Sequence, residues 1–295
     1  MENKLQKDDL IGIISPCYPV NKGQYDDAIK GLKALGYRVV LGKNLYKNTY
    51  GYSATEKERA YDFNDMIVNK DVKMILFGGG YAGNEIVPYI DYESIIKNPK
   101  LIVSYSDGTN ILNTITSCTG LKTYYGQRPS TFVNITKFNR KSFENNFVLT
   151  DCKEVIRNSD WNIICPGKGE GQLIGGYLEN FSFMIGNPYF RLSDNQKYIL
   201  FLEDYVDFNP LIKVSMYLSN IEQSSLMRNV TGLLFGHYSD DKNEDLFDRL
   251  YRFGSKHRIP VLQCDDFGHG KNNGIIQIGS NAVLDSKTRS LRYLQ

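Results

Sequence analysis

Short apolar runs alternate with amphipathic segments along the first part of the chain. Residues 11–15 form one such run, and the segment after it, "YDDAIKGLKALG", places Ala28, Leu32 and Leu35 on one face of a helix that ends at Gly36. The apolar run "YRVVL" follows. This order of strand, helix and strand predicts a βαβ unit at the start of the fold.

The same alternation continues as far as "LIVSYSDGTN". Ser53 and Glu56 have the spacing of a capping box and predict a helix that runs to about Asn69. The runs "VKMILF" and "NPKLIVSYS" predict two more strands. Helices of about 10 to 15 residues between strands favour a parallel sheet, whose functional groups gather at the carboxyl ends of the strands. Gly78–Gly80 and Ser106 stand at two such ends.

The pattern changes after "YYGQRPSTF". Residues 136–162 mix charged, aromatic and short apolar pieces, which predicts a linker with one strand at "NFVLT". Further on, "YILFLED", "VTGLLFG" and "IPVLQCD" predict strands, and "GIIQIG" with "NAVLDSKTRSLRYL" predicts a closing hairpin. We therefore expect a domain at 1–135, this linker, and a mixed α/β domain at 163–295.

Composition narrows the classes of protein. The chain has 295 residues, of which 41% are hydrophobic and 23% charged, with a formal net charge of +2. These values are typical of a globular protein and give no electrostatic argument for binding nucleic acid or an anionic membrane. We expect a small-molecule partner and neither nucleic acid nor membrane.

The termini and cysteines add little chemistry. The first 16 residues contain too short an apolar run for a signal peptide, and no stretch approaches the roughly 18 apolar residues of a membrane span, so we expect a cytoplasmic protein. The five cysteines lack C-x-x-C spacing and are odd in number. This argues against a disulfide framework and a zinc site and favours buried thiols.

Ser106 follows an apolar run and precedes a predicted helix in "LIVSYSDGTN". A serine at such a turn can expose its hydroxyl beside the free N–H groups of the helix, which suits acyl transfer. Ser and Asp are also favoured helix caps, so Ser106 or Asp107 can serve the helix alone. The pattern G-x-S-x-G is absent, which disfavours an ordinary α/β-hydrolase elbow.

A nucleophilic serine needs a base, and the chain has three histidines. His269, in "DDFGHGKNN", is the best candidate because the glycine-rich loop has no apolar face and leaves the imidazole accessible. Glu203 and Asp204 follow an apolar run and are candidates to orient it, although strand periodicity sends them to opposite sides.

The glycine turn "GGGYAGNE" has several interpretations. It lacks the spacing of a dinucleotide loop and the lysine of a P-loop. Adjacent glycines let a substrate carbonyl approach backbone N–H groups, which suits an oxyanion hole, and a plain tight turn is the alternative. No histidine pair or acidic cluster indicates a metal, and we expect no cofactor.

Several motifs together resemble one family. "GGGYAGNEIVPYIDYESIIKNPKLIVSYSDGT" is similar to the N-terminal signature of the LD-carboxypeptidases, serine peptidases that include the microcin C immunity peptidases. "PGKGEGQLIGGYLENFSFMIGNPY", "ILFLED", "VTGLLFGHYSD" and "IPVLQCDDFGHG" resemble its C-terminal signatures in the same order. The resemblance spans about Leu10 to Asp285. It implies a flavodoxin-like parallel-sheet N-terminal domain, a smaller mixed α/β C-terminal domain, and commonly a homodimer.

The resemblance also implies roles for individual residues. Ser106 would be the nucleophile, His269 the base and Glu203 the residue that orients it. The oxyanion hole would use backbone N–H groups of Gly79 or Gly80 and of Asp107, whose side chain would be left to cap the helix.

The implied activity is release of the terminal D-alanine from a murein tetrapeptide during cell-wall recycling. Gly78 stands where many relatives have Arg, and Gln127-Arg128 departs from a shorter apolar stretch. Because the nucleophile, acid and base are all present, these departures bear on the identity of the substrate rather than on the serine chemistry. Tyr81 and Arg128 are candidates to contact substrate, Arg128 through a substrate carboxylate. The alternatives are a microcin-immunity-type peptidase acting on aminoacyl phosphoramidates and a noncatalytic muropeptide-binding protein.

Overall fold

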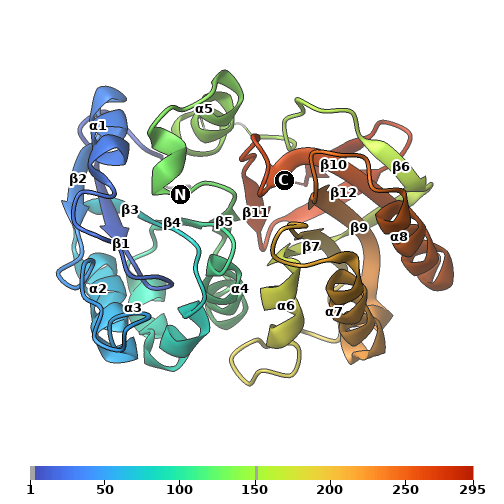
Figure 1. Ribbon diagram of the computed structural model, residues 1–295, viewed down its shortest axis with the longest axis horizontal. Helices are drawn as coiled ribbons and strands as arrows, with labels where there is room; N and C mark the ends of the chain where they lie inside the picture. Colours follow the sequence, from blue (N-terminus) through green and yellow to red (C-terminus); the bar gives the residue numbers. More distant parts are fainter. Residues whose placement is uncertain (1–3, 150–151, 295) are drawn as a thin grey trace.

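The computed structural model describes residues 4–149 and 152–294. It contains two β-sheets that lie side by side, each accompanied by helices (Figure 1). The first half of the chain builds most of one sheet and the second half builds the other. The predicted α/β class, with a parallel-sheet N-terminal domain followed by a mixed α/β domain, is confirmed.

The first sheet has six strands in the order β11-β5-β4-β3-β1-β2. The first five strands of the chain are mutually parallel, and β11 pairs antiparallel with β5. The order 2-1-3-4-5 within it is that of flavodoxin-like folds, which bind ligands where the strand order reverses. The strands are β1 (Leu10–Ile14), β2 (Arg38–Leu41), β3 (Val72–Phe77), β4 (Leu101–Ser104), β5 (Thr123–Tyr125) and β11 (Ile276–Ile278).

Four α-helices and one 3₁₀ helix connect strands β1 to β5, and a second 3₁₀ helix follows β5. They are α1 (Asp26–Ala34), α2 (Glu56–Val68), η1 (Gly83–Tyr89), α3 (Tyr92–Lys97), α4 (Gly108–Thr119) and η2 (Pro129–Phe132). The capping box of α2 is formed by Thr55 and Glu58, so the predicted pair Ser53 and Glu56 is wrong by two residues. Ser53 is buried and its hydroxyl donates to the carbonyl of Ala54, so it cannot cap the helix.

Residues 137–148 are helical. Helix α5 (Lys137–Phe143) continues into a π turn, η3 (Glu144–Val148). The strand predicted at "NFVLT" is therefore wrong for residues 146–149, and its last residue lies outside the described residues. Phe143 and Phe147 are four residues apart, and both rings are buried in one apolar cluster with strands of the first sheet. Helical spacing is what brings both rings to that core.

The second sheet has seven strands in the order β13-β12-β7-β8-β9-β10-β6. Strands β7 to β10 are parallel, whereas β6, β12 and β13 pair antiparallel. The elements are β6 (Asn162–Cys165), β7 (Lys168–Tyr177), α6 (Leu178–Met184), β8 (Tyr198–Glu203), α7 (Leu211–Gln223), η4 (Ser225–Asn229), β9 (Val230–His237), α8 (Glu244–His257), β10 (Val261–Gly268), β12 (Asn281–Asp285) and β13 (Ser290–Tyr293).

The end of the chain joins the two sheets. Strands β12 and β13 form a hairpin, but the segment "GIIQIG" does not belong to it as predicted. That segment crosses to the first sheet as β11 and pairs with β5. All three isoleucines of the segment, Ile275, Ile276 and Ile278, are buried, and the burial of this apolar surface favours the crossing.

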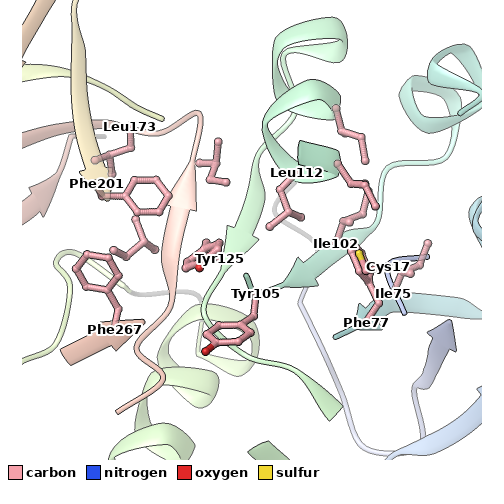
Figure 2. Packing of buried hydrophobic residues seen from close by; sticks show 14 of the residues in the cluster. Cys17, Ile75, Phe77, Ile102, Tyr105, Leu112, Tyr125, Leu173, Phe201 and Phe267 are labelled. Atoms are coloured by element: carbon pink, nitrogen blue, oxygen red, sulfur yellow. The ribbon is translucent and has the colours of Figure 1, made fainter. Parts of the chain in front are cut away.

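Helix α4 is held against the second sheet by hydrogen bonds. The Asn113 amide donates to the carbonyl of Gly175 at 2.7 Å and accepts from the N–H of Gly175 at 3.1 Å. Thr109 Oγ1 accepts from the N–H of Tyr177 at 2.9 Å. One apolar cluster runs through both halves, with Tyr105 and Tyr125 between the side chains of the two sheets (Figure 2). The two halves therefore share a core as well as a boundary.

Candidate active site

A cleft of about 1120 Å³ lies where strands of the two sheets end. The turn after β3, Ser106 after β4, the residues after β8 and His269 after β10 all contribute to its wall. The carboxyl ends of parallel strands are where α/β folds place their ligands. The fold thus brings the candidates from both halves into one cavity.

Ser106 occupies a strained turn between β4 and α4. Its φ is +54°, a left-handed conformation that is uncommon for any residue other than glycine. The N-cap of α4 is Asp107, and no side chain makes a capping hydrogen bond there. Helix capping is therefore not what Ser106 does. A serine held at a left-handed strand-to-helix turn has the backbone geometry of a nucleophile elbow.

Glu203 and His269 form a direct pair. Glu203 is the last residue of β8 and is completely buried. Its Oε2 and Oε1 lie 2.9 Å and 3.1 Å from Nδ1 of His269. A buried carboxylate on Nδ1 favours the tautomer that carries its proton there and leaves Nε2 free to accept one. This is the arrangement a general base requires.

The surroundings of His269 differ from the exposed loop that the glycines indicate. The side chain of His269 is only 10% exposed. Its ring lies 4.5 Å from that of Tyr105 and 5.0 Å from that of Tyr177, and it stacks on Tyr205 at 5.7 Å with an interplanar angle of 12°. Packing by aromatic rings from other elements, which the local sequence cannot show, holds the imidazole in place.

The glycine turn lies against Ser106. A Cβ on Gly79 would come within 2.5 Å of Ser106 Cβ and 3.0 Å of its Oγ. Gly80 has a φ of +155°, and a Cβ there would meet the carbonyl oxygen of Cys17 at 2.3 Å. Both positions therefore require glycine. The close approach puts turn backbone beside the nucleophile, where an oxyanion hole has to be.

The carboxyl group of Asp107 does not cap α4, so that expectation is wrong. It accepts from the N–H of Gly83 at 2.6 Å and from Nδ2 of Asn180 at 2.7 Å. Burial raises the pKa of Asp107, and the hydrogen bond from Gly83 partly opposes that rise. The side chain thus ties the turn after β3 to helix α6 of the second half.

Two further candidates line the cleft. Tyr81 is 83% exposed. The guanidinium of Arg128 lies 4.3 Å from the centre of the Tyr105 ring, and its Nε donates to Ser130 Oγ at 2.7 Å. Stacking on an aromatic ring leaves the other N–H groups of an arginine available for a planar anion.

Two residues lie close to Glu203: Asp204, which the sequence offered as the other candidate acid, and Tyr125, which sequence reasoning missed. Burial raises the pKa of Asp204 to about 7, against a hydrogen bond from Asn209. Tyr125 donates a hydrogen bond from its hydroxyl group to Glu203 Oε1. No local motif identifies Tyr125, because its contact with Glu203 joins segments that are far apart in the chain.

The other two histidines pair with carboxylates away from the cleft lining. His237 Nδ1 lies 3.2 Å from Asp265, and His257 Nε2 lies 3.1 Å from Glu222. Within residues 4–149 and 152–294, no group of three or more His, Cys, Asp or Glu side chains is arranged to hold a metal ion. The helices of those residues also include none long and apolar enough to cross a bilayer.

The fold is that of a two-sheet α/β protein whose cleft is lined by a serine and by a histidine that is paired with a buried glutamate. Residues 11–126 match the family model described as the LD-carboxypeptidase N-terminal domain, and residues 170–284 match that of the LD-carboxypeptidase C-terminal domain. The chain belongs to the LD-carboxypeptidase family, as its motifs predict. At the level of that family, membership supports a serine-type peptidase.

Individual relatives span nearly the whole chain. A probable murein peptide carboxypeptidase of Bacillus subtilis is 29% identical, over 97% of this chain and 92% of the relative. The microcin C7 self-immunity protein MccF of Escherichia coli is 27% identical, over 96% and 92%. The crystal structure of an MccF-like protein from Bacillus anthracis superposes with a TM-score of 0.89 at 26% identity, covering 99% of this chain and 98% of that one.

Proposed function

We propose that this protein is a serine carboxypeptidase that releases the terminal D-alanine of murein tetrapeptides. The bond is the amide between meso-diaminopimelate or lysine and D-alanine. The observation that carries the proposal is the Glu203–His269 pair at 2.9 Å in the same cleft as a left-handed Ser106. The relative named as a probable murein peptide carboxypeptidase supports the choice of substrate.

The proposed reaction uses these residues in turn. His269 Nε2 accepts the proton of Ser106 as the serine oxygen attacks the substrate carbonyl, and Glu203 stabilises the imidazolium through Nδ1. N–H groups of Gly79 or Gly80 and of Asp107 stabilise the oxyanion. His269 then returns the proton to the amine of D-alanine, which leaves. Water, deprotonated by His269, hydrolyses the acyl-enzyme and restores Ser106.

Arg128 is the proposed site for the carboxylate of the terminal D-alanine. It lines the same cleft as Ser106, with its guanidinium over the Tyr105 ring. Tyr81, on the turn after β3, is proposed to contact the substrate from the exposed side. A half-buried arginine that only contacts solvent is the alternative, which a comparison of peptides with and without the terminal carboxylate distinguishes.

Release of D-alanine from a defined murein tetrapeptide, followed by chromatography, tests this function. We expect hydrolysis by the wild-type protein and its loss in Ser106→Ala and in His269→Ala. Full activity in either variant would contradict the mechanism. Labelling by a fluorophosphonate that is lost in Ser106→Ala would argue against a noncatalytic muropeptide-binding protein.

The second candidate function is cleavage of aminoacyl-nucleotide phosphoramidates, as in microcin immunity. The likeness to the MccF-like structure, at a TM-score of 0.89, favours it. An aminoacyl sulfamoyl adenylate assayed beside the tetrapeptide separates the two. Cleavage of the nucleotide compound alone would exclude the murein substrate.

We also propose that the protein acts in the cytoplasm as a homodimer. Light scattering on the purified protein tests the dimer, and fractionation of cells that produce the full chain tests the location.

A further inference from the structure

Tyr125 lies between the two halves of the active site. It is the last residue of β5 in the first sheet, and its side chain is completely buried. Its ring lies 6.0 Å from that of Tyr105 and 5.7 Å from that of Phe201, which belongs to the second sheet (Figure 2). The residue therefore reaches from the sheet of the nucleophile into the sheet of the base.

The hydroxyl group of Tyr125 has two partners, both in the active site. It accepts from the backbone N–H of Ser106 at 3.0 Å and donates to Oε1 of Glu203. Burial first, and the charge of Glu203 second, raise the pKa of Tyr125 well above its ordinary value. The phenol consequently keeps its proton and remains a donor to the carboxylate.

The donor and the acceptor of each of these hydrogen bonds can be assigned. A backbone N–H can only donate, so the phenol must accept from Ser106 and has its own proton left for Glu203. The carboxylate can only accept, so it takes the Nδ1 proton of His269. Ser106 N–H thus donates to Tyr125, and Tyr125 and His269 both donate to Glu203, so the four groups form one connected set of hydrogen bonds that converges on the carboxylate.

We propose that Tyr125 is a positioning residue that couples the nucleophile turn to the Glu203–His269 pair. The inference rests on the proposed function, because it assigns Tyr125 a role in the same reaction. Tyr125 does two things at once. It satisfies the buried N–H of a residue held at a φ of +54°, and it fixes the rotation of a carboxylate that has no access to water.

The phenol also tunes the base. A donor on Oε1 withdraws charge from the carboxylate and so weakens the stabilisation that Glu203 gives to the imidazolium. Removing that donor makes protonation of His269 easier. The acidic limb of the pH–rate profile should therefore move to higher pH in Tyr125→Phe. Simple loosening of the fold does not produce this effect.

The test compares Tyr125→Phe with Tyr198→Phe. Tyr198 is a matched control: it is buried at the start of β8, the strand that ends in Glu203, and its hydroxyl accepts from the Ser193 N–H at 2.8 Å and donates to the Ser193 carbonyl at 3.2 Å. The readout is the rate constant for fluorophosphonate labelling of Ser106 across pH, corrected for the fraction of reactive protein. It requires no knowledge of the natural substrate.

We expect labelling of Tyr125→Phe to be about 10- to 100-fold slower, as for a misplaced catalytic group, with the acidic limb at higher pH. Tyr198→Phe should keep the wild-type rate and limb. Incorporation of 3-fluorotyrosine at position 125 keeps the ring and strengthens the donor, so the limb should move to lower pH. This variant also supports the test should Tyr125→Phe fold poorly.

The outcomes are separable. If the wild-type protein is labelled at Ser106 and both substitutions at position 125 leave rate and limb unchanged, the coupling role is wrong while the proposed function stands. If wild-type Ser106 is not labelled at all, the proposed function is wrong and the inference is overturned with it. If labelling were slowed equally in Tyr198→Phe, general loss of packing would explain the effect, and the inference would also be overturned.

Discussion

The two sheets prepare their parts of the site by different physical means. The first sheet works through its backbone, with Ser106 in a left-handed turn and Gly79 so close that a methyl group would overlap the serine. The second sheet works through side-chain packing, with Glu203 buried at a strand end and His269 surrounded by aromatic rings. Substitutions that add volume should therefore harm the first half of the site, and substitutions that change polarity or charge should harm the second.

The strongest test removes one reacting group from each side. Ser106→Ala and His269→Ala should each lower kcat by about 10⁴-fold or more, because each removes a reacting group from the same unit. The double variant should be little worse than either single variant. Steady-state kinetics on the tetrapeptide would check this, and additive losses would show that the two halves do not act together.

In the second half, the buried carboxyl group of Asp204 should make the free energy of unfolding depend on pH. The unfolded chain releases this proton near pH 4 and the folded chain near pH 7, so between these values the folded state binds more protons and is destabilised as pH rises. Asp204→Asn removes that loss, and its stability relative to wild type should rise by up to about 4 kcal/mol from pH 4 to pH 7.

Urea unfolding at several pH values measures that difference. Asp207→Asn is the control, because Asp207 is exposed and only three residues away. A difference between Asp204→Asn and wild type that stays constant across the range would contradict the assigned titration. If the stability difference between Asp207→Asn and wild type also changed with pH, the titration would belong to a group other than Asp204.

In the first half, activity should be sensitive to added side-chain volume at Gly79. Gly79→Ala should lower kcat by about 10²-fold, because the new methyl group must displace Ser106 by enough to misalign it. Gly78→Ala is the matched change one residue earlier, where a Cβ would meet only the Tyr25 hydroxyl at 3.2 Å, and it should lose much less. If both variants lost the same activity, contact with Ser106 would not be the cause. The turn would then exclude side chains for another reason.

The smallest expected effect concerns Arg128, which the first half contributes to substrate binding. Arg128→Ala should raise KM for the tetrapeptide by about 10-fold, as expected for the loss of one hydrogen bond to a charged group, with kcat little changed. A tetrapeptide that ends in a carboxamide should show no such increase. An equal increase for both peptides would mean that Arg128 supports the cleft without binding the carboxylate.

Much of the architecture follows from local sequence. Apolar runs such as "VKMILF", with helices between them, were sufficient to predict the parallel sheet and the strand ends at which Gly79 and Ser106 stand. The errors have local causes too. Residues 146–148 of the expected strand are helical because Phe143 and Phe147 both reach one core, and "GIIQIG" leaves the closing hairpin because its isoleucines are buried against the first sheet.

By itself the sequence determined the α/β class, the family and the residue types that can carry serine chemistry, because periodicity and motif spacing are properties of short segments. Tertiary structure alone decided how those residues meet. It turned Asp107 from a helix cap into a link between the halves, enclosed His269 in aromatic rings, and placed the Tyr125 hydroxyl between Ser106 and Glu203. These contacts join residues far apart in the chain, and burial gives them their strength, so no local pattern encodes them.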